Sequence, residues 1–158
     1  YGELLCKTEA AARFAETCVD LSVFLTATDG SSSPSDRTLR PVNRRAVYDD
    51  PCHLIHAQRV SREPRALLAA IPGLQLLALE EADLCCGAAG VYNLTQPELA
   101  DRLLERKVRH IIASGADLVV TGNPGCLLQL DAGLRAAHST IEVRHLAEVL
   151  DWSGWGDR

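Results

Sequence analysis

Hydrophobic residues recur along this chain with two periods, one typical of β-strands and the other of amphipathic helices. Short apolar runs predict four β-strands, over residues 45–48, 74–79, 117–121 and 141–143. Apolar positions at helical spacing predict helices over residues 3–27, 53–60, 64–71, 96–113, 126–137 and 145–150. Strands that alternate with helices of this length predict an α/β fold: an open, mainly parallel four-stranded sheet with helices on both faces, preceded by an N-terminal helix.

One segment has the composition of a loop, the Gly-, Ser- and Pro-rich stretch over residues 28–41. It separates the N-terminal helix from the alternating strands and helices. We therefore expect three parts: an N-terminal helix with its Ser/Pro-rich loop (1–43), an α/β domain (44–151) and a C-terminal tail (152–158).

Composition narrows the class of protein. Of the 158 residues, 47% are hydrophobic and 23% are charged, which are ordinary values for a globular domain. The net charge of −5 and the absence of a basic stripe argue against nucleic acid as a partner. No apolar run approaches the roughly 18 residues of a membrane span, so we expect none. Because the sequence begins with Tyr1 and has no methionine, we expect it to be a piece of a longer protein.

Four of the six cysteines lie in loops that follow predicted strands: Cys52, Cys85, Cys86 and Cys126. In an open α/β sheet, the loops that leave the carboxyl ends of neighbouring strands meet at one edge, where such folds bind ligands. Four thiolates at one edge form a site for a soft metal, with iron–sulfur clusters and zinc as the main candidates. In a chain without signs of secretion, this pattern favours metal binding or redox chemistry over disulfides.

The local sequence around each cysteine supports this interpretation. Cys52 and Cys126 are each expected at the start of a helix, where free N–H groups and the helix dipole lower the pKa of a thiol. Taken alone, either could be a small buried hydrophobic residue. The adjacent Cys85 and Cys86, followed by Gly87, can reach two irons of one cluster. A vicinal disulfide is the rival explanation for the pair, and it is strained and uncommon.

The other polar residues carry weaker signals. His53 is as compatible with a hydrogen bond to a metal centre as with a solvated side chain. Solvated or core roles are favoured for His56, His110, His138 and His145. Cys6 and Cys18 lie about 120° apart around the predicted first helix, so they share no face and we interpret both as structural. A solvated helix face is predicted for Glu105, Arg106, Lys107 and Arg109.

The three cysteine loops, in this order and spacing, resemble the cysteine-rich CCG domain of heterodisulfide reductase. The same domain occurs in iron–sulfur subunits of bacterial glycolate and lactate oxidases. The resemblance covers about residues 45–150 and is carried by four stretches, Asp50 to Leu54, Ala82 to Gly87, Tyr92 to Glu98 and Thr121 to Leu127. These stretches are most similar to the C-terminal part of the iron–sulfur subunit in glycolate oxidase (glycolate dehydrogenase).

The resemblance implies a Rossmann-like CCG domain over residues 44–151 and a role in electron transfer. Proteins of this family accept electrons from flavin-containing oxidase subunits that oxidise glycolate or another 2-hydroxy acid, such as lactate. They pass these electrons toward the quinone pool. The complex would be cytoplasmic and peripheral on the inner face of the cell membrane. This chain alone would not turn over substrate, and we assign it no catalytic residue.

The ligand set that we hypothesise is Cys52, Cys85, Cys86 and Cys126. The family motif ends in Cys-x-x-Cys, but this chain has Asn123 at the first of those positions. Four thiolates suit an ordinary [4Fe–4S] cluster or a tetrahedral zinc site. Close backbone approach is expected at Gly87 and Gly125, with His53 and Asn123 as supporting groups around the ligands.

Two alternatives predict other chemistry. A structural zinc module would dock partner subunits and carry no electrons. A thiol-redox enzyme would act through Cys126 or through the Cys85 and Cys86 pair, and would need a thiol of low pKa.

Overall fold

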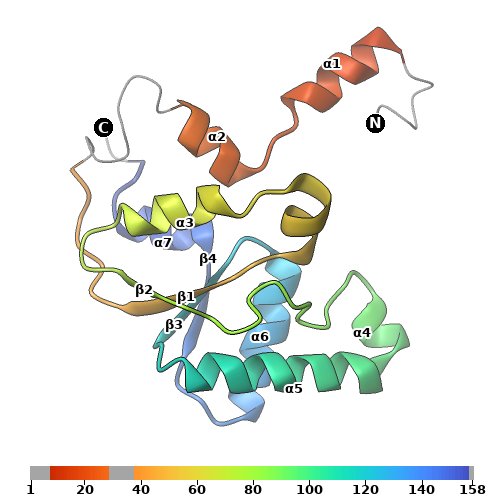
Figure 1. Ribbon diagram of the computed structural model, residues 1–158, viewed down its shortest axis with the longest axis vertical. Coiled ribbons are helices and arrows are strands. Elements are labelled where there is room, and N and C mark those ends of the chain that lie inside the picture. The colour runs from red at the N-terminus through yellow and green to blue at the C-terminus, as the bar shows by residue number, and fades with distance from the viewer. Residues whose placement is uncertain (1–7, 29–37, 157–158) are drawn as a thin grey trace.

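The computed structural model describes residues 8–28 and 38–156 (Figure 1). Parts of three predicted features lie outside these ranges. They are the beginning of the N-terminal helix with Cys6, residues 29–37 of the Ser/Pro-rich loop, and the last two residues of the tail.

A four-stranded sheet forms the centre of the structure, and each predicted strand is present. The strands are β1 (Arg45–Asp49), β2 (Gln75–Leu77), β3 (Leu118–Thr121) and β4 (Glu142–His145). Their order across the sheet is β2-β1-β3-β4, and every neighbouring pair is parallel. β1 therefore lies between β2 and β3, and the loops that leave these three strands emerge side by side at the carboxyl edge.

Helices cover both faces of this sheet, as predicted (Figure 1). They are α3 (Arg62–Ala69) and α7 (Leu146–Trp152) on one face, and α5 (Pro97–Ala113) and α6 (Pro124–Ala136) on the other. Successive residues of a strand point to opposite faces, so Tyr48 of β1 packs in the core under α3 and α7, whereas Val47 packs in the core under α5 and α6.

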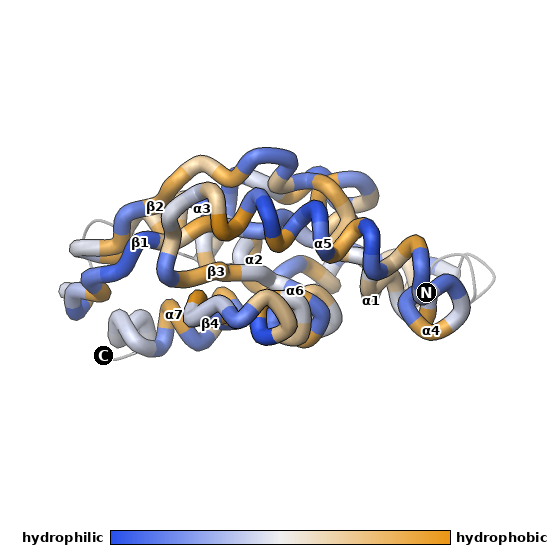
Figure 2. Tube along the Cα trace, turned by 90° about the horizontal axis from the view of Figure 1, so that it is seen from below, coloured by the Kyte–Doolittle hydropathy of each residue, from blue (hydrophilic) through white to orange (hydrophobic). Residues whose placement is uncertain are grey.

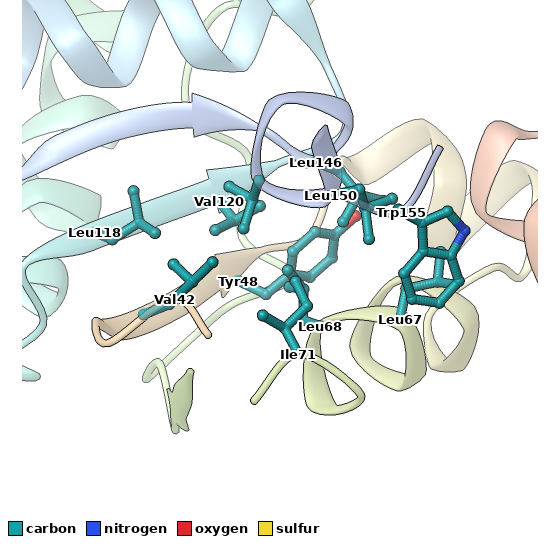
Figure 3. Close-up of a cluster of buried hydrophobic side chains, with 12 residues drawn as sticks. Val42, Tyr48, Leu67, Leu68, Ile71, Leu118, Val120, Leu146, Leu150 and Trp155 are labelled. Carbon is teal, nitrogen blue, oxygen red and sulfur yellow. The ribbon is translucent and has the colours of Figure 1, made fainter. Parts of the chain in front are cut away.

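The first of these cores is centred on an aromatic ring. Figure 3 shows the ring of Tyr48 between Leu68 and Ile71 on one side and Val120 of β3 on the other. Trp155, from the predicted tail, lies beside Leu67 and is only 5% exposed. The residues after α7 therefore contribute to this core.

Two short helical segments flank the cysteine loops. The helix predicted over residues 53–60 is observed as a π-helical turn, η3 (His53–Gln58). The segment α4 (Tyr92–Thr95), which precedes α5, was not predicted. Among the described residues, no helix has both the length and the apolar character required to cross a bilayer.

The prediction of a single N-terminal helix is wrong in its continuity, because the described residues form α1 (Glu9–Thr17) and α2 (Leu21–Thr28). Cys18 has an extended backbone that ends α1. The Oδ1 of Asp20 then accepts a hydrogen bond of 2.8 Å from the backbone N–H of Ser22. This is the hydrogen bond of an N-cap, which starts a new helix. Apolar spacing continued across a position where the capping chemistry favoured a break.

The solvated face predicted for α5 needs one correction. Glu105, Arg106 and Arg109 are exposed as expected, but the side chain of Lys107 is fully buried. Figure 2 shows hydrophilic and hydrophobic residues alternating along α5, as an amphipathic helix requires. Lys107 lies three residues after Leu104 and four before the buried Ile111, on the stripe that faces the sheet. Its neighbours in sequence misled the prediction.

Two adjacent isoleucines of α5 test which face carries the core. Ile111 is fully buried, whereas Ile112 is 46% exposed. Ile111→Ala should lower the free energy of unfolding by about 2–5 kcal/mol, because it leaves a cavity under the sheet. Ile112→Ala should lower it by only about 0.5 kcal/mol. Urea denaturation of both variants measures the difference, and equal losses would contradict this packing.

Candidate metal centre

The four predicted ligands lie at the carboxyl edge of three neighbouring strands. Cys52 follows β1 and begins η3, and Cys126 follows β3 in the first turn of α6. Cys85 and Cys86 lie in the loop between β2 and α4. The expected meeting of the three loops is thus what the topology produces.

The four thiols interact with one another. The thiol of Cys126 donates a hydrogen bond to Cys86, and that of Cys85 donates one to Cys52. Electrostatic interactions also join Cys52 to Cys126 and Cys85 to Cys86. All four are free thiols, so Cys85 and Cys86 do not form the vicinal disulfide that was the rival explanation. Donors from three separate loops therefore share one small region.

The thiol pKa values differ from the sequence prediction. The hydrogen bond with Cys86 and then burial raise the pKa of Cys126, so the lowered pKa predicted from its helix position is wrong in the metal-free protein. The same hydrogen bond holds the pKa of Cys86 below its ordinary value, against the opposing effect of burial. Burial raises the pKa of Cys85. Contacts between distant residues thus outweigh the effect of the helix start.

Backbone N–H groups point at two of the sulfurs. The N–H of Gly87 donates to the Sγ of Cys85 at 3.4 Å, and that of Ala88 donates to Cys86. Gly87 has φ of +91°, a conformation that favours glycine. A Cβ at this position would lie 2.5 Å from the carbonyl oxygen of Ala100 in α5. The backbone of the loop therefore lies directly against α5, as the close approach predicted for Gly87 requires.

The predicted supporting residues meet on the exposed side of the cysteines. Asn123 caps α6, with its Oδ1 accepting a hydrogen bond of 2.8 Å from the N–H of Gly125. Its Nδ2 lies 3.4 Å from the Nδ1 of His53. A Cβ on Gly125 would be 3.9 Å from the Cβ of Ala88, so the loops after β2 and β3 lie close together. Asn123 thus organises the start of α6 in place of a thiolate.

A cavity of about 400 Å³ opens beside Cys52 and Cys85. The other residues that line it are His56, Glu81, Asp83 and Leu84. Cys86 and Cys126 lie deeper, with 3% and 4% of their surface exposed. The thiols therefore range from half-buried beside the cavity to buried under the sheet edge.

Two acidic residues at the end of β1 carry charge to this region, and sequence analysis missed both. Asp49 is 1% exposed, and its Oδ1 lies 3.0 Å from the Nζ of the buried Lys107. Burial raises the pKa of Asp49 to about 6, against the opposing effect of Lys107. Asp50 accepts two hydrogen bonds of 2.5 Å from the guanidinium of Arg65. The signal that was available was the place of Lys107 on the apolar stripe of α5.

The donor set fits an iron–sulfur cluster chemically. Iron–sulfur clusters are held by cysteine thiolates and are tuned by hydrogen bonds to their sulfurs and by burial, and all three features are present. Within residues 8–28 and 38–156, no group of three or more His, Cys, Asp or Glu side chains is placed around a single metal ion.

Comparison with known proteins gives a family match and several relatives. The cysteine-rich domain family CCG matches residues 46–131. The chain is 42% identical over 106 residues to the "Probable glycolate oxidase iron-sulfur subunit" of Bacillus subtilis (strain 168), which is 66% of this chain and 24% of the relative. It is 35% identical over 109 residues to "Lactate utilization protein A" of Shouchella clausii, covering 69% of this chain and 46% of the relative.

A third relative is archaeal, and its name makes it one of the subunits of a fumarate reductase (CoM/CoB). The chain is 35% identical over 134 residues to this protein of Methanothermobacter marburgensis, covering 84% of this chain and 26% of the relative. The chain thus spans between a quarter and a half of the length of these relatives.

Two glycines of the cysteine loop test how tightly it packs. Gly87→Ala should lower the free energy of unfolding through backbone strain of about 1–2 kcal/mol and through the clash with Ala100, worth about 1–3 kcal/mol more. Gly90 also has a positive φ, of +67°, but a Cβ there meets nothing within 4 Å. Gly90→Ala should therefore show the strain alone. Denaturation of the metal-free protein measures both, and equal losses would contradict the close packing.

Proposed function

Because the chain belongs to the cysteine-rich CCG domain family, we propose that it holds an iron–sulfur cluster and serves in electron transfer. The ligands are Cys52, Cys85, Cys86 and Cys126. The observation that carries the proposal is the interaction of these four thiols, brought from three loops to one edge of the sheet. Four thiolates match the requirement of a [4Fe–4S] cluster.

When bound, such a cluster accepts and releases single electrons. The residues of the chain do the rest. The N–H groups of Gly87 and Ala88 donate to sulfur, which stabilises negative charge at the ligands. The sheet edge excludes water from Cys86 and Cys126, while Cys52 and Cys85 border the open cavity. Electrons would enter or leave most readily on the cavity side, where the ligands lie nearest to solvent.

The wider role follows from the relatives. Their names describe iron–sulfur or other subunits of glycolate oxidation, lactate utilisation and fumarate reduction. We infer a place in a glycolate or other 2-hydroxy acid oxidase complex that is cytoplasmic and peripheral on the inner membrane face. The chain would take electrons from flavin-containing subunits and pass them toward quinone.

A thiol enzyme is less compatible with the site. Cys126 has a raised pKa, which disfavours it as a nucleophile. Cys86 has a lowered pKa, but it is only 3% exposed and cannot meet a substrate. The two cysteines that the alternative needs thus lack either reactivity or access.

Cysteine-to-serine variants test the proposal. Cys126→Ser and Cys86→Ser should each lose most of the iron and acid-labile sulfide, because a ligand to the cluster is removed. Cys18→Ser is the matched control, since Cys18 is exposed and lies in the N-terminal arm before α2. It should keep the iron and sulfide of the parent protein.

Iron, zinc and sulfide are counted per chain after anaerobic purification. About one zinc with no sulfide in the parent protein would contradict electron transfer and support a structural role. Undiminished iron in Cys126→Ser would remove that residue from the ligand set.

A further inference from the structure

We propose that the buried pair of Asp49 and Lys107 sets the electron affinity of the metal centre. Asp49 places a negative charge beside the cysteines, and Lys107 compensates it. This inference rests on the proposed function, since it concerns the reduction potential of a cluster held by the four thiols.

The position of Lys107 is fixed by its contacts. Its Nζ lies 3.0 Å from the Oδ1 of Asp49 and donates to the carbonyl oxygens of Glu81 at 2.7 Å and Ala82 at 3.0 Å. An ammonium group has three donors, so three acceptors occupy all of them. Neither Lys107 nor Asp49 exposes more than 1% of its surface. The pair therefore presents two charges at constant positions inside the protein.

These charges lie within range of the ligands. The carboxylate of Asp49 acts electrostatically on both Cys86 and Cys126, and the ammonium of Lys107 acts on Cys86. The effect of Asp49 on Cys86 is the larger of the two. Away from water, such interactions are weakened less than at the surface. A centre held by Cys86 and Cys126 therefore experiences a partly compensated negative charge.

The fold does not need this pair for its stability. Replacing a buried ion pair with apolar residues of similar volume is often neutral or stabilising, because both charges lose their hydration. Most buried positions around it are apolar, including Val108 and Ile111 on the same helix. The place of the pair beside the ligands gives the charges a use that packing alone would not.

Lys107 also positions the loop that carries two ligands. The carbonyls of Glu81 and Ala82 precede Cys85 by only a few residues, and the second of them also accepts a hydrogen bond of 3.1 Å from the N–H of Asp50. A purely structural role would thus be a reasonable alternative for Lys107. The test must distinguish a change of charge from a change of shape.

Three variants make that distinction by their reduction potentials. Asp49→Asn removes the negative charge and leaves Lys107, so the reduced centre is stabilised and the potential should rise. In the double variant Asp49→Asn/Lys107→Met both charges are absent, so the potential should fall below that of Asp49→Asn. It should stay above the parent value, because Asp49 acts on the thiols more strongly than Lys107 does.

Asp117→Asn, the third variant, is the matched control. Asp117 pairs with Arg44 at 2.6 Å, and it precedes β3 at the opposite edge of the sheet. This variant removes a carboxylate from an ion pair far from the cysteines, so its potential should equal that of the parent protein.

Redox titration of the anaerobically purified proteins, followed by EPR, measures the potentials. In Asp49→Asn, the ratio of reduced to oxidised centre at a fixed potential should rise about tenfold, which is about 59 mV for a one-electron couple. Equal potentials in the parent, Asp49→Asn and the double variant, at equal iron content, would overturn the inference while leaving the proposed function intact. A parent protein without iron and sulfide would overturn both.

If Asp49→Asn loses its iron, the double variant decides alone. A potential above the parent value supports the inference, and an unchanged one overturns it.

Discussion

Parallel pairing of β1 with β2 on one side and β3 on the other is the constraint on which the rest of the structure depends. It directs the three loops that follow these strands to one edge of the sheet. Cys52, Cys85, Cys86 and Cys126 are far apart in the sequence and close in space for this reason alone. An antiparallel β1 would place Cys52 at the opposite edge, and no arrangement of side chains could then restore the site.

Several contacts hold the cysteine loops against this edge. Gly87 lies so close to α5 that a single Cβ would strike the backbone. Lys107 of the same helix binds two carbonyls of the segment that leads to Cys85. Arg65 of α3 binds the carboxylate of Asp50, two residues before Cys52. Because elements from both faces of the sheet contribute, the positions of the thiols depend on the whole fold and not on any one loop.

Most of the fold and the candidate ligands could be predicted from local patterns. Apolar runs and helical spacing identified all four strands and the main helices, and the loops after the strands identified the cysteines. The break between α1 and α2 was missed because apolar spacing says nothing about the cap that Asp20 provides. The burial of Lys107 was missed because three exposed charged residues surround it in sequence.

The chemistry of the thiols was harder to predict than their positions. The pKa of Cys126 depends on Cys86, which is forty residues away in the sequence, and not on the helix start that is visible locally. The charge of Asp49 likewise reaches the ligands only through the folded sheet. Local sequence can thus indicate which atoms could bind a metal, whereas the electrostatic setting of those atoms depends on contacts that form on folding.

The central claim is that four cysteines from three loops hold one iron–sulfur cluster. Native mass spectrometry of the anaerobically purified protein tests it most directly, because the mass reveals the composition of whatever each chain carries. The account predicts the mass of the chain plus the iron and sulfide of one cluster. A mass equal to that of the bare chain, or to the chain with a single zinc ion, would contradict it.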